Sequence, residues 1–206
     1  MKSVEIGELL KKFEWSHMNR IYGCAHSSII GFITYEWLKL SSTNSVIDGA
    51  PSPNIGSGRT GQTNADLLLC RDKKPYIPVE VETNVIKYSE KLESLYAYKN
   101  AFPSVEFGLL YMTNLISGGS KYQHNWEHIK QEVINRTRTD RIPIALVSSV
   151  KSKLNFTLRD NWSELLKRND YSSWEIVGID YWIFDLKEKV SQGNLWRSMC
   201  LKKHLD

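Results

Sequence analysis

Residues 65–83, ADLLLCRDKKPYIPVEVET, consist of two short apolar runs on either side of the polar segment DKKP. Two such runs joined by a polar turn predict a β-hairpin. Three acids interrupt its apolar pattern: Asp66 directly precedes Leu67, and Glu80 and Glu82 follow in the second run. Successive side chains of a strand point to opposite faces, so Glu80 and Glu82 share one face. A turn at residues 72–75 therefore predicts that Asp66, Glu80 and Glu82 converge.

Three converging carboxylates repel one another and raise one another's pKa unless a cation neutralises them. Mg²⁺ suits this task, because it is usually held by one or two carboxylates together with waters. A metal-bound water loses its proton more readily, and the ion neutralises charge that develops on a scissile phosphate. The hairpin therefore predicts a site for phosphodiester hydrolysis with Mg²⁺ as cofactor, for which Mn²⁺ is expected to substitute.

Outward from the hairpin, apolar spacing predicts helices and strands in alternation. Helices are predicted at 4–13, 26–40, 88–101, 122–138 and 162–168 and in the tail from Leu186, strands at 105–112, 142–150 and 174–184, and a loop at 41–64. Strands that alternate with helices favour an α/β sheet with helices on its faces. The length suits one domain over residues 1–206.

The string of Asp66, thirteen residues and Glu80-Val81-Glu82 resembles the D…(D/E)-x-K core of the PD-(D/E)XK nuclease superfamily, which includes restriction endonucleases. The surrounding order of helix, hairpin, helix and strand is similar over residues 26–115. The resemblance implies a restriction-endonuclease-like mixed central sheet flanked by helices, with residues 120–206 completing the sheet and supplying a DNA-contact surface. It further implies a Mg²⁺-dependent endodeoxyribonuclease that acts on double-stranded DNA as a homodimer.

The resemblance also implies roles for particular residues. Asp66 and Glu80 would bind the metal, and Glu82, which replaces the usual lysine of the motif, would orient or activate the attacking water. Lys87 or Lys91, on the helix after the hairpin, could take the lysine's role instead.

In many members of that superfamily the leading helix contributes a further acid. Glu36 is the matching residue here, and the alternative is that it pairs with Lys39 at an exposed helix edge. Polar residues outside the motif are candidate nucleic-acid contacts. They are Arg59, Gln62, Arg71, Arg136, Arg138 and Arg141.

Other interpretations remain for the two glutamates, for the activity of the chain and for its substrate. Glu80 and Glu82 could form the solvent face of an edge strand, with Pro78 marking that edge. Without the motif lysine, the chain could be a catalytically degenerate nucleic-acid-binding or assembly module with the same fold. A structure-specific or RNA-directed nuclease would use the same site.

The composition indicates the cellular environment and the kind of partner that we expect for the chain. The net charge of +4 arises from the part after residue 119, which is compatible with a polyanionic partner. No apolar run approaches the roughly 18 residues of a membrane span, and the N-terminus lacks the apolar core of a signal peptide, so no membrane association is expected. Three widely spaced cysteines, Cys24, Cys70 and Cys200, suit reduced thiols in the cytoplasm.

Overall fold

A computed structural model of the chain describes residues 2–20, 26–49, 64–82, 88–116, 120–140, 142–153, 174–187 and 190–197. Within these ranges the strands are β1 (Asn44–Asp48), β2 (Leu67–Arg71), β3 (Lys74–Glu82), β4 (Gly108–Ile116), β5 (Ile144–Lys153), β6 (Trp174–Phe184) and β7 (Val190–Arg197). The helices are α1 (Ser3–Lys11), the 3-10 helix η1 (Trp15–Arg20), α2 (His26–Leu40), α3 (Tyr88–Ala101) and α4 (Ser120–Asp140).

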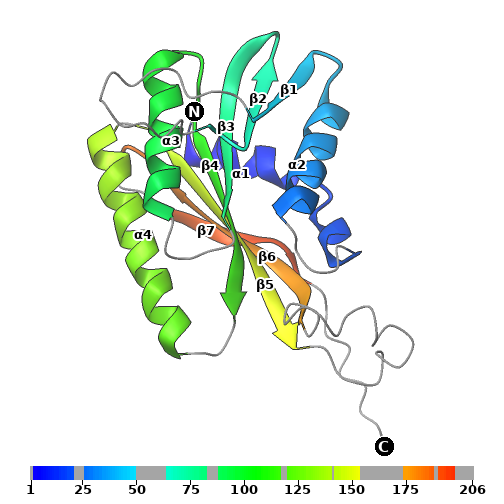
Figure 1. The fold of residues 1–206 in the computed structure, drawn as a ribbon, viewed down its shortest axis with the longest axis vertical. Coiled ribbons are helices and arrows are strands. Elements are labelled where there is room, and N and C mark those ends of the chain that lie inside the picture. The colour runs from blue at the N-terminus through cyan, green and yellow to red at the C-terminus, as the bar shows by residue number, and fades with distance from the viewer. Residues whose placement is uncertain are drawn as a thin grey trace, which may run out of the picture.

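The strands form one mixed sheet in the order β1-β2-β3-β4-β5-β6-β7, so neighbours in the sheet are also neighbours in the chain (Figure 1). The pairs at both ends of the sheet are antiparallel, whereas β3, β4 and β5 run parallel. Parallel neighbours need a crossover connection. Helices α3 and α4 provide these crossovers. The predicted α/β class, with a mixed central sheet flanked by helices, is confirmed.

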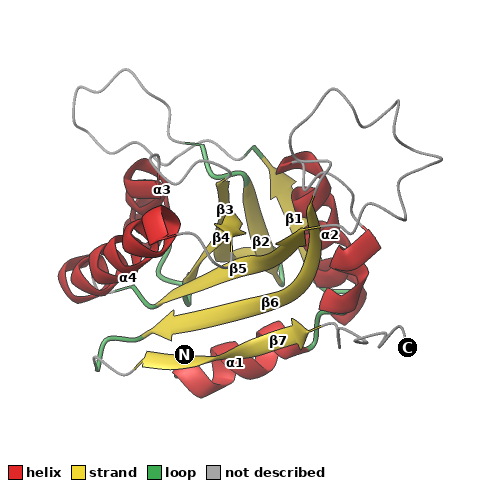
Figure 2. Ribbon diagram, turned by 90° about the horizontal axis from the view of Figure 1, so that it is seen from below, coloured by secondary structure: helices red, strands yellow, loops and turns green. Residues whose placement is uncertain are grey.

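The helices cover the two faces of the sheet in separate layers (Figure 2). One apolar core lies between the sheet and α1, η1 and α2, with Trp15 and Trp37 among its largest buried side chains. The other core lies between the opposite face and α3 and α4, around Leu95 and Tyr98. Alternation along β3 divides its side chains between these cores: Val79 and Val81 enter the first, so Glu80 points toward the layer of α3.

The hairpin turn is tighter than the predicted segment at residues 72–75. Arg71 pairs directly with Lys74, which leaves only Asp72 and Lys73 in the turn. Both have positive φ angles, 51° and 61°. Two successive positive φ angles define the type I′ turn, whose twist matches that of the flanking strands. The turn therefore fixes the pairing of β2 with β3, and with it the relative position of the acids at the other end.

The predicted helices at 26–40 and 88–101 and the strand at 174–184 have the observed bounds. Two predictions are wrong: β1 lies inside the segment predicted as a loop, and β7 replaces part of the predicted helical tail. Both are outer strands with largely exposed residues, so neither carries the apolar alternation that identifies a half-buried strand. The short helix predicted at 162–168 lies outside the described residues.

In the part of the chain that the structure describes, no helix combines the length and the apolar character needed to cross a membrane.

Candidate functional site

The acids of the hairpin lie in the interior of the sheet. β3 has β2 on one side and, from Val79 to Glu82, β4 on the other. Glu80 is wholly buried and Glu82 is 7% exposed. The interpretation of these two glutamates as the solvent face of an edge strand is therefore wrong. A buried carboxylate needs partners, because desolvation strongly disfavours its charged form.

Asp66 is held at the start of β2 by the main chain of β3. The Val81 N–H donates a 2.7 Å hydrogen bond to Asp66 Oδ2. This bond joins the first residue of the motif to the residue between the two glutamates, as folding at the turn requires. Asp66 is the more accessible of the two acids that meet here, with 15% of its side chain exposed.

Lys91 completes the cluster from the first turn of α3. Its Nζ lies 2.7 Å from Glu80 Oε2 and 3.4 Å from Asp66 Oδ2. One ammonium thus bridges two carboxylates from different strands. We call Asp66, Glu80 and Lys91 the Asp66 group. Of the two lysines that were candidates for the missing motif lysine, Lys91 lies in the cluster, and Lys87 lies outside the described residues.

A histidine that the sequence analysis did not single out also reaches this point. His26 Nε2 lies 3.2 Å from Asp66 Oδ2. His26 is the first residue of α2, in the layer opposite α3, so the site lies where both helical layers meet the start of β2. Its only signal in the sequence is its position at the start of a predicted helix. It stands forty positions before Asp66, so no local pattern links the two residues.

The surroundings of Glu80 and Asp66 shift the pKa values of these two acids in opposite directions. Burial raises the pKa of Glu80 to about 8, although the adjacent Lys91 acts to lower it. Burial also acts to raise the pKa of Asp66, but the Val81 N–H and the charge of Lys91 outweigh it and hold that pKa below the usual value. For Lys91, the lowering effect of burial is exceeded by the effect of Glu80 and Asp66, and its pKa is raised. The cluster therefore pairs an ionised Asp66 and a charged Lys91 with a Glu80 that retains its proton near neutral pH.

Glu82 does not join the other two acids. It lies two residues beyond Glu80 on the same strand, about 6.6 Å further along. Among the described residues, the group of three side chains that brings metal-ligand atoms within 4.8 Å of one another is Glu14, His17 and Glu36. The predicted convergence thus holds for Asp66 and Glu80, which share Lys91, and does not extend to Glu82.

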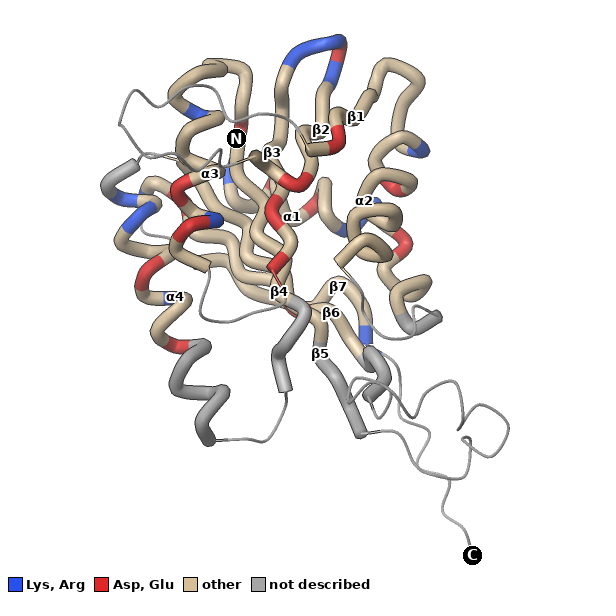
Figure 3. The backbone as a smooth tube through the Cα atoms, viewed as in Figure 1, with Lys and Arg blue, Asp and Glu red and all other residues tan. Residues whose placement is uncertain are grey.

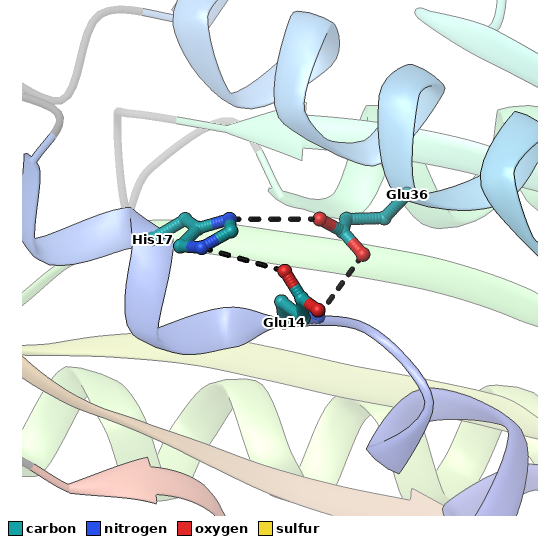
Figure 4. A group of neighbouring side chains, drawn as sticks. All are labelled: Glu14, His17 and Glu36. Carbon is teal, nitrogen blue, oxygen red and sulfur yellow. Dashed lines mark hydrogen bonds and ion pairs between the residues drawn. The ribbon is translucent and has the colours of Figure 1, made fainter.

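Glu36 is also absent from the Asp66 group, which corrects its prediction as the further acid of that site. It lies ten residues after His26, about 15 Å along the helix axis. Its carboxylate points toward Glu14 and His17 of the N-terminal segment (Figure 4). The leading helix reaches Asp66 with its first residue instead.

Of the predicted nucleic-acid contacts, the structure describes Arg71, Arg136 and Arg138. Arg71 is at the far end of β2, about 17 Å along the strand from Asp66, next to the hairpin turn, where basic residues gather (Figure 3). Its guanidinium carbon stacks 4.0 Å from the ring centroid of Tyr76 and 5.5 Å from that of Trp37. Arg71 therefore packs against two aromatic rings at this end of the hairpin.

On α4, Arg136 forms ion pairs with Glu93 of α3 at 3.6 Å and with Glu132 at 3.3 Å. Arg138 is exposed on the same helix. Arg59, Gln62 and Arg141 lie outside the described residues.

The donor chemistry of the Asp66 group fits a hard divalent ion. Its two carboxylates offer only oxygen, the ligand type that Mg²⁺ and Mn²⁺ prefer. Glu80 Oε1 is buried without a close hydrogen-bond partner among the described residues, although the Ser94 hydroxyl lies near enough to act on the pKa of Glu80. A buried oxygen without a donor is costly, and a cation would satisfy it.

Compared with known proteins, the chain has no significant match to a family model, to a curated sequence or to a solved structure.

Proposed function

We propose that this chain is a Mg²⁺-dependent endodeoxyribonuclease with a restriction-endonuclease-like fold. One observation carries the proposal: Lys91 Nζ contacts both Glu80 and Asp66, the two acids whose spacing resembles the nuclease motif. An aspartate, a glutamate and a lysine are the residue types of that motif. Here the lysine comes from α3 in place of the strand position that Glu82 occupies.

The arrangement of the elements supports the same proposal. The resemblance implies a leading helix, a hairpin that carries the motif, a helix and a further strand. In the chain these correspond to α2, the β2–β3 hairpin, α3 and β4, in this order. The acids lie near the carboxyl end of β3, beside the parallel strand β4. This is the edge at which α/β sheets usually bind ligands.

In this proposal Asp66 and Glu80 would hold Mg²⁺, or Mn²⁺ in its place. The bound ion would supply a more acidic water and charge neutralisation at the phosphate. Asp66 is already ionised, whereas Glu80 must give up its proton to become a ligand. Lys91 would then orient the water, since its ammonium already contacts both carboxyl groups. His26 would keep Asp66 in position from the opposite layer.

A plasmid assay tests the proposal. Supercoiled DNA is incubated with the full chain and Mg²⁺ or Mn²⁺, and nicked and linear products are followed with time. Asp66→Asn, Glu80→Gln and Lys91→Met preserve side-chain size and remove the proposed chemistry. Each should lower the rate by at least about 100-fold, as the removal of one preorganised catalytic group does in other enzymes.

Matched variants control for the loss of a charge elsewhere. Glu127→Gln removes an exposed carboxylate of α4, and Lys99→Met removes a lysine about two turns after Lys91 on α3. Both should keep the wild-type rate. Metal-dependent nicking that persists unchanged in the Asp66 and Glu80 variants would refute this site.

A second candidate function has an observation of its own. Lys91 already contacts both Asp66 and Glu80 without a metal, and Glu82 is not part of the Asp66 group. These features favour a catalytically degenerate module that binds double-stranded DNA and does not cut it. Wild-type protein that retards a DNA duplex on a gel, yet never nicks the plasmid with either ion, would establish this alternative.

Two further parts of the proposal concern the assembly and its setting. Cutting both strands of DNA usually needs two sites, so we expect a homodimer. A cytoplasmic location is consistent with Cys70, which is a buried free thiol. Sedimentation of the full chain with and without a DNA duplex would establish the assembly state.

A further inference from the structure

The carboxylate of Glu36 on α2 is wholly buried, and its two oxygens have different surroundings. Oε2 accepts a 3.1 Å hydrogen bond from the Glu14 N–H and lies 3.0 Å from Lys39 Nζ. Oε1 is buried as well and has no hydrogen-bond partner among the described residues. One of the two oxygens of a buried carboxyl group is thus left unsatisfied, which native proteins generally avoid.

Oε1 of Glu36 points toward two side chains from the N-terminal segment (Figure 4). His17 Nδ1 lies 3.9 Å away, which is too far for a hydrogen bond. His17 Nε2 lies 3.4 Å from Glu14 Oε2. One potential ligand atom of each residue lies within 4.8 Å of the other two. The unsatisfied oxygen is therefore aimed into a group of three metal-ligating side chains.

We propose that Glu14, His17 and Glu36 form a binding site for a divalent transition ion of the Zn²⁺ type. Zn²⁺ binds imidazole and carboxylate ligands at about 2.0–2.2 Å, so two of its ligand atoms lie about 3–4 Å apart. The 3.9 Å separation between Glu36 Oε1 and His17 Nδ1 falls in this range. Glu14 and His17 are about half exposed and can make the small remaining movement, whereas Glu36 is the fixed member.

The ligand geometry distinguishes this site from the Asp66 group. Among the described residues, Glu14, His17 and Glu36 bring one ligand atom each within 4.8 Å of the other two, whereas His26, Asp66 and Glu80 do not. An imidazole together with carboxylates suits Zn²⁺. Lys39 contacts Oε2 of both Glu14 and Glu36, at 3.2 Å and 3.0 Å, and leaves Oε1 of Glu36 to the ion. The two sites are about 15 Å apart along α2. The inference is thus independent of the proposed nuclease activity.

The site would fasten the N-terminal segment to the helix that packs on the hairpin. Glu14 and His17 lie at the end of the α1–η1 connection and in η1, and Glu36 lies in the C-terminal half of α2. An ion held by both segments stabilises only the folded arrangement, because the unfolded chain does not hold the three ligands together. Zn²⁺ should therefore raise the thermal stability of the protein, whether or not DNA is cut.

The test uses the full chain, stripped of metal with a chelator and kept in excess Mg²⁺. ZnCl₂ is titrated calorimetrically, the Zn²⁺ retained after dialysis is measured by mass spectrometry, and the melting temperature is recorded with and without Zn²⁺. We expect retention of about one Zn²⁺ per chain and a higher melting temperature. His17→Ala and Glu14→Gln should each weaken binding at least about tenfold, since even the loss of a group that only supports a ligand does so.

Two further variants serve as controls. Asp66→Asn alters the other candidate metal site, and His128→Ala removes an exposed histidine of α4. Both should retain Zn²⁺ and its effect on the melting temperature. The proposal is overturned if the wild-type chain retains no Zn²⁺, if His17→Ala and Glu14→Gln bind it as the wild type does, or if Asp66→Asn is the variant that loses it.

Discussion

Lys91 Nζ lies 2.7 Å from Glu80 Oε2, and this carboxylate is wholly buried. The contact joins α3 to β3 at the point where the sheet carries its buried acids. Because burial raises the pKa of Glu80 to about 8, the charge on this carboxylate changes within the range of pH at which proteins are usually handled. The packing of α3 on the sheet and the ionisation of Glu80 are therefore linked.

Replacing Glu80 with glutamine should flatten the dependence of stability on pH. In the folded chain the pKa of Glu80 is raised from 4.5 to about 8, so between these values the folded state holds a proton that the unfolded state has lost. The free energy of unfolding should then fall as pH rises through this window, by up to about 1.4 kcal/mol per pH unit. Urea denaturation of wild type and Glu80→Gln at several pH values measures this difference. Parallel pH profiles would contradict the raised pKa.

Lys91 and Glu80 should be energetically coupled. Lys91→Met removes the cation that lowers the pKa of Glu80, so that pKa should rise above 8 and the chain should be less stable at alkaline pH. In the Glu80→Gln background the same replacement should cost less, because no buried carboxylate is left unpaired. Contacting groups usually show coupling of about 0.5–3 kcal/mol in such double-mutant cycles. Denaturation of all four proteins at pH 8 gives the coupling, and strictly additive costs would show that the contact contributes nothing.

The hairpin turn should gain stability from a glycine at its second position. Lys73 has φ 61°, a conformation that costs an L-residue with a side chain about 1 kcal/mol and that glycine adopts freely. Lys73→Gly also produces the Asp-Gly pair that type I′ turns favour. The free energy of unfolding should rise by up to about 1 kcal/mol. Lys74→Gly is the control, since residue 74 belongs to β3 and should lose stability there.

Replacing Gly31 or Gly108 with alanine should change the stability of the protein in opposite directions. Gly31 lies within α2, and a Cβ there would meet nothing within 4 Å, so Gly31→Ala should stabilise the helix by about 0.5–1 kcal/mol. Gly108 begins β4, and its Cβ would lie 3.0 Å from Ile144 Cδ1 and 3.1 Å from Leu95 Cβ. Gly108→Ala should therefore overpack the contact of α3 with the sheet and cost about 1–3 kcal/mol. Thermal denaturation of the two variants compares them directly.

The sequence was sufficient to predict the pairing of Asp66 with Glu80, because strand alternation and a short turn determine both positions. It also indicated Lys91, since a helix that follows the second strand returns across it. The place of Glu36 was not predictable in this way. Helical periodicity gives the face of a helix that is buried, but which residue meets the end of a strand depends on how the helix docks.

The two missed strands have a related cause. β1 reads NSVID and β7 reads VSQGNLWR, and neither alternates clearly between apolar and polar residues. Strand propensity depends on packing against neighbours more than on the residue itself. An outer strand packs only some of its side chains against the core, Val46 in β1 and Leu195 and Trp196 in β7, and its hydrogen bonds to the adjoining strand leave no mark on its own sequence. The His26 contact with Asp66 was missed for the same reason, as it is purely tertiary.

The sequential order of the sheet has a consequence for synthesis on the ribosome. From β1 to β7, each strand pairs with the one translated just before it, so the sheet can grow as the chain emerges. The first helix is the exception. It packs beside β6 and β7, where Ser191 Oγ donates a 3.1 Å hydrogen bond to Ser3 Oγ across 188 positions of sequence. The segment made first must therefore wait for the strand made last, and the nascent chain reaches its native packing only when both have left the exit tunnel.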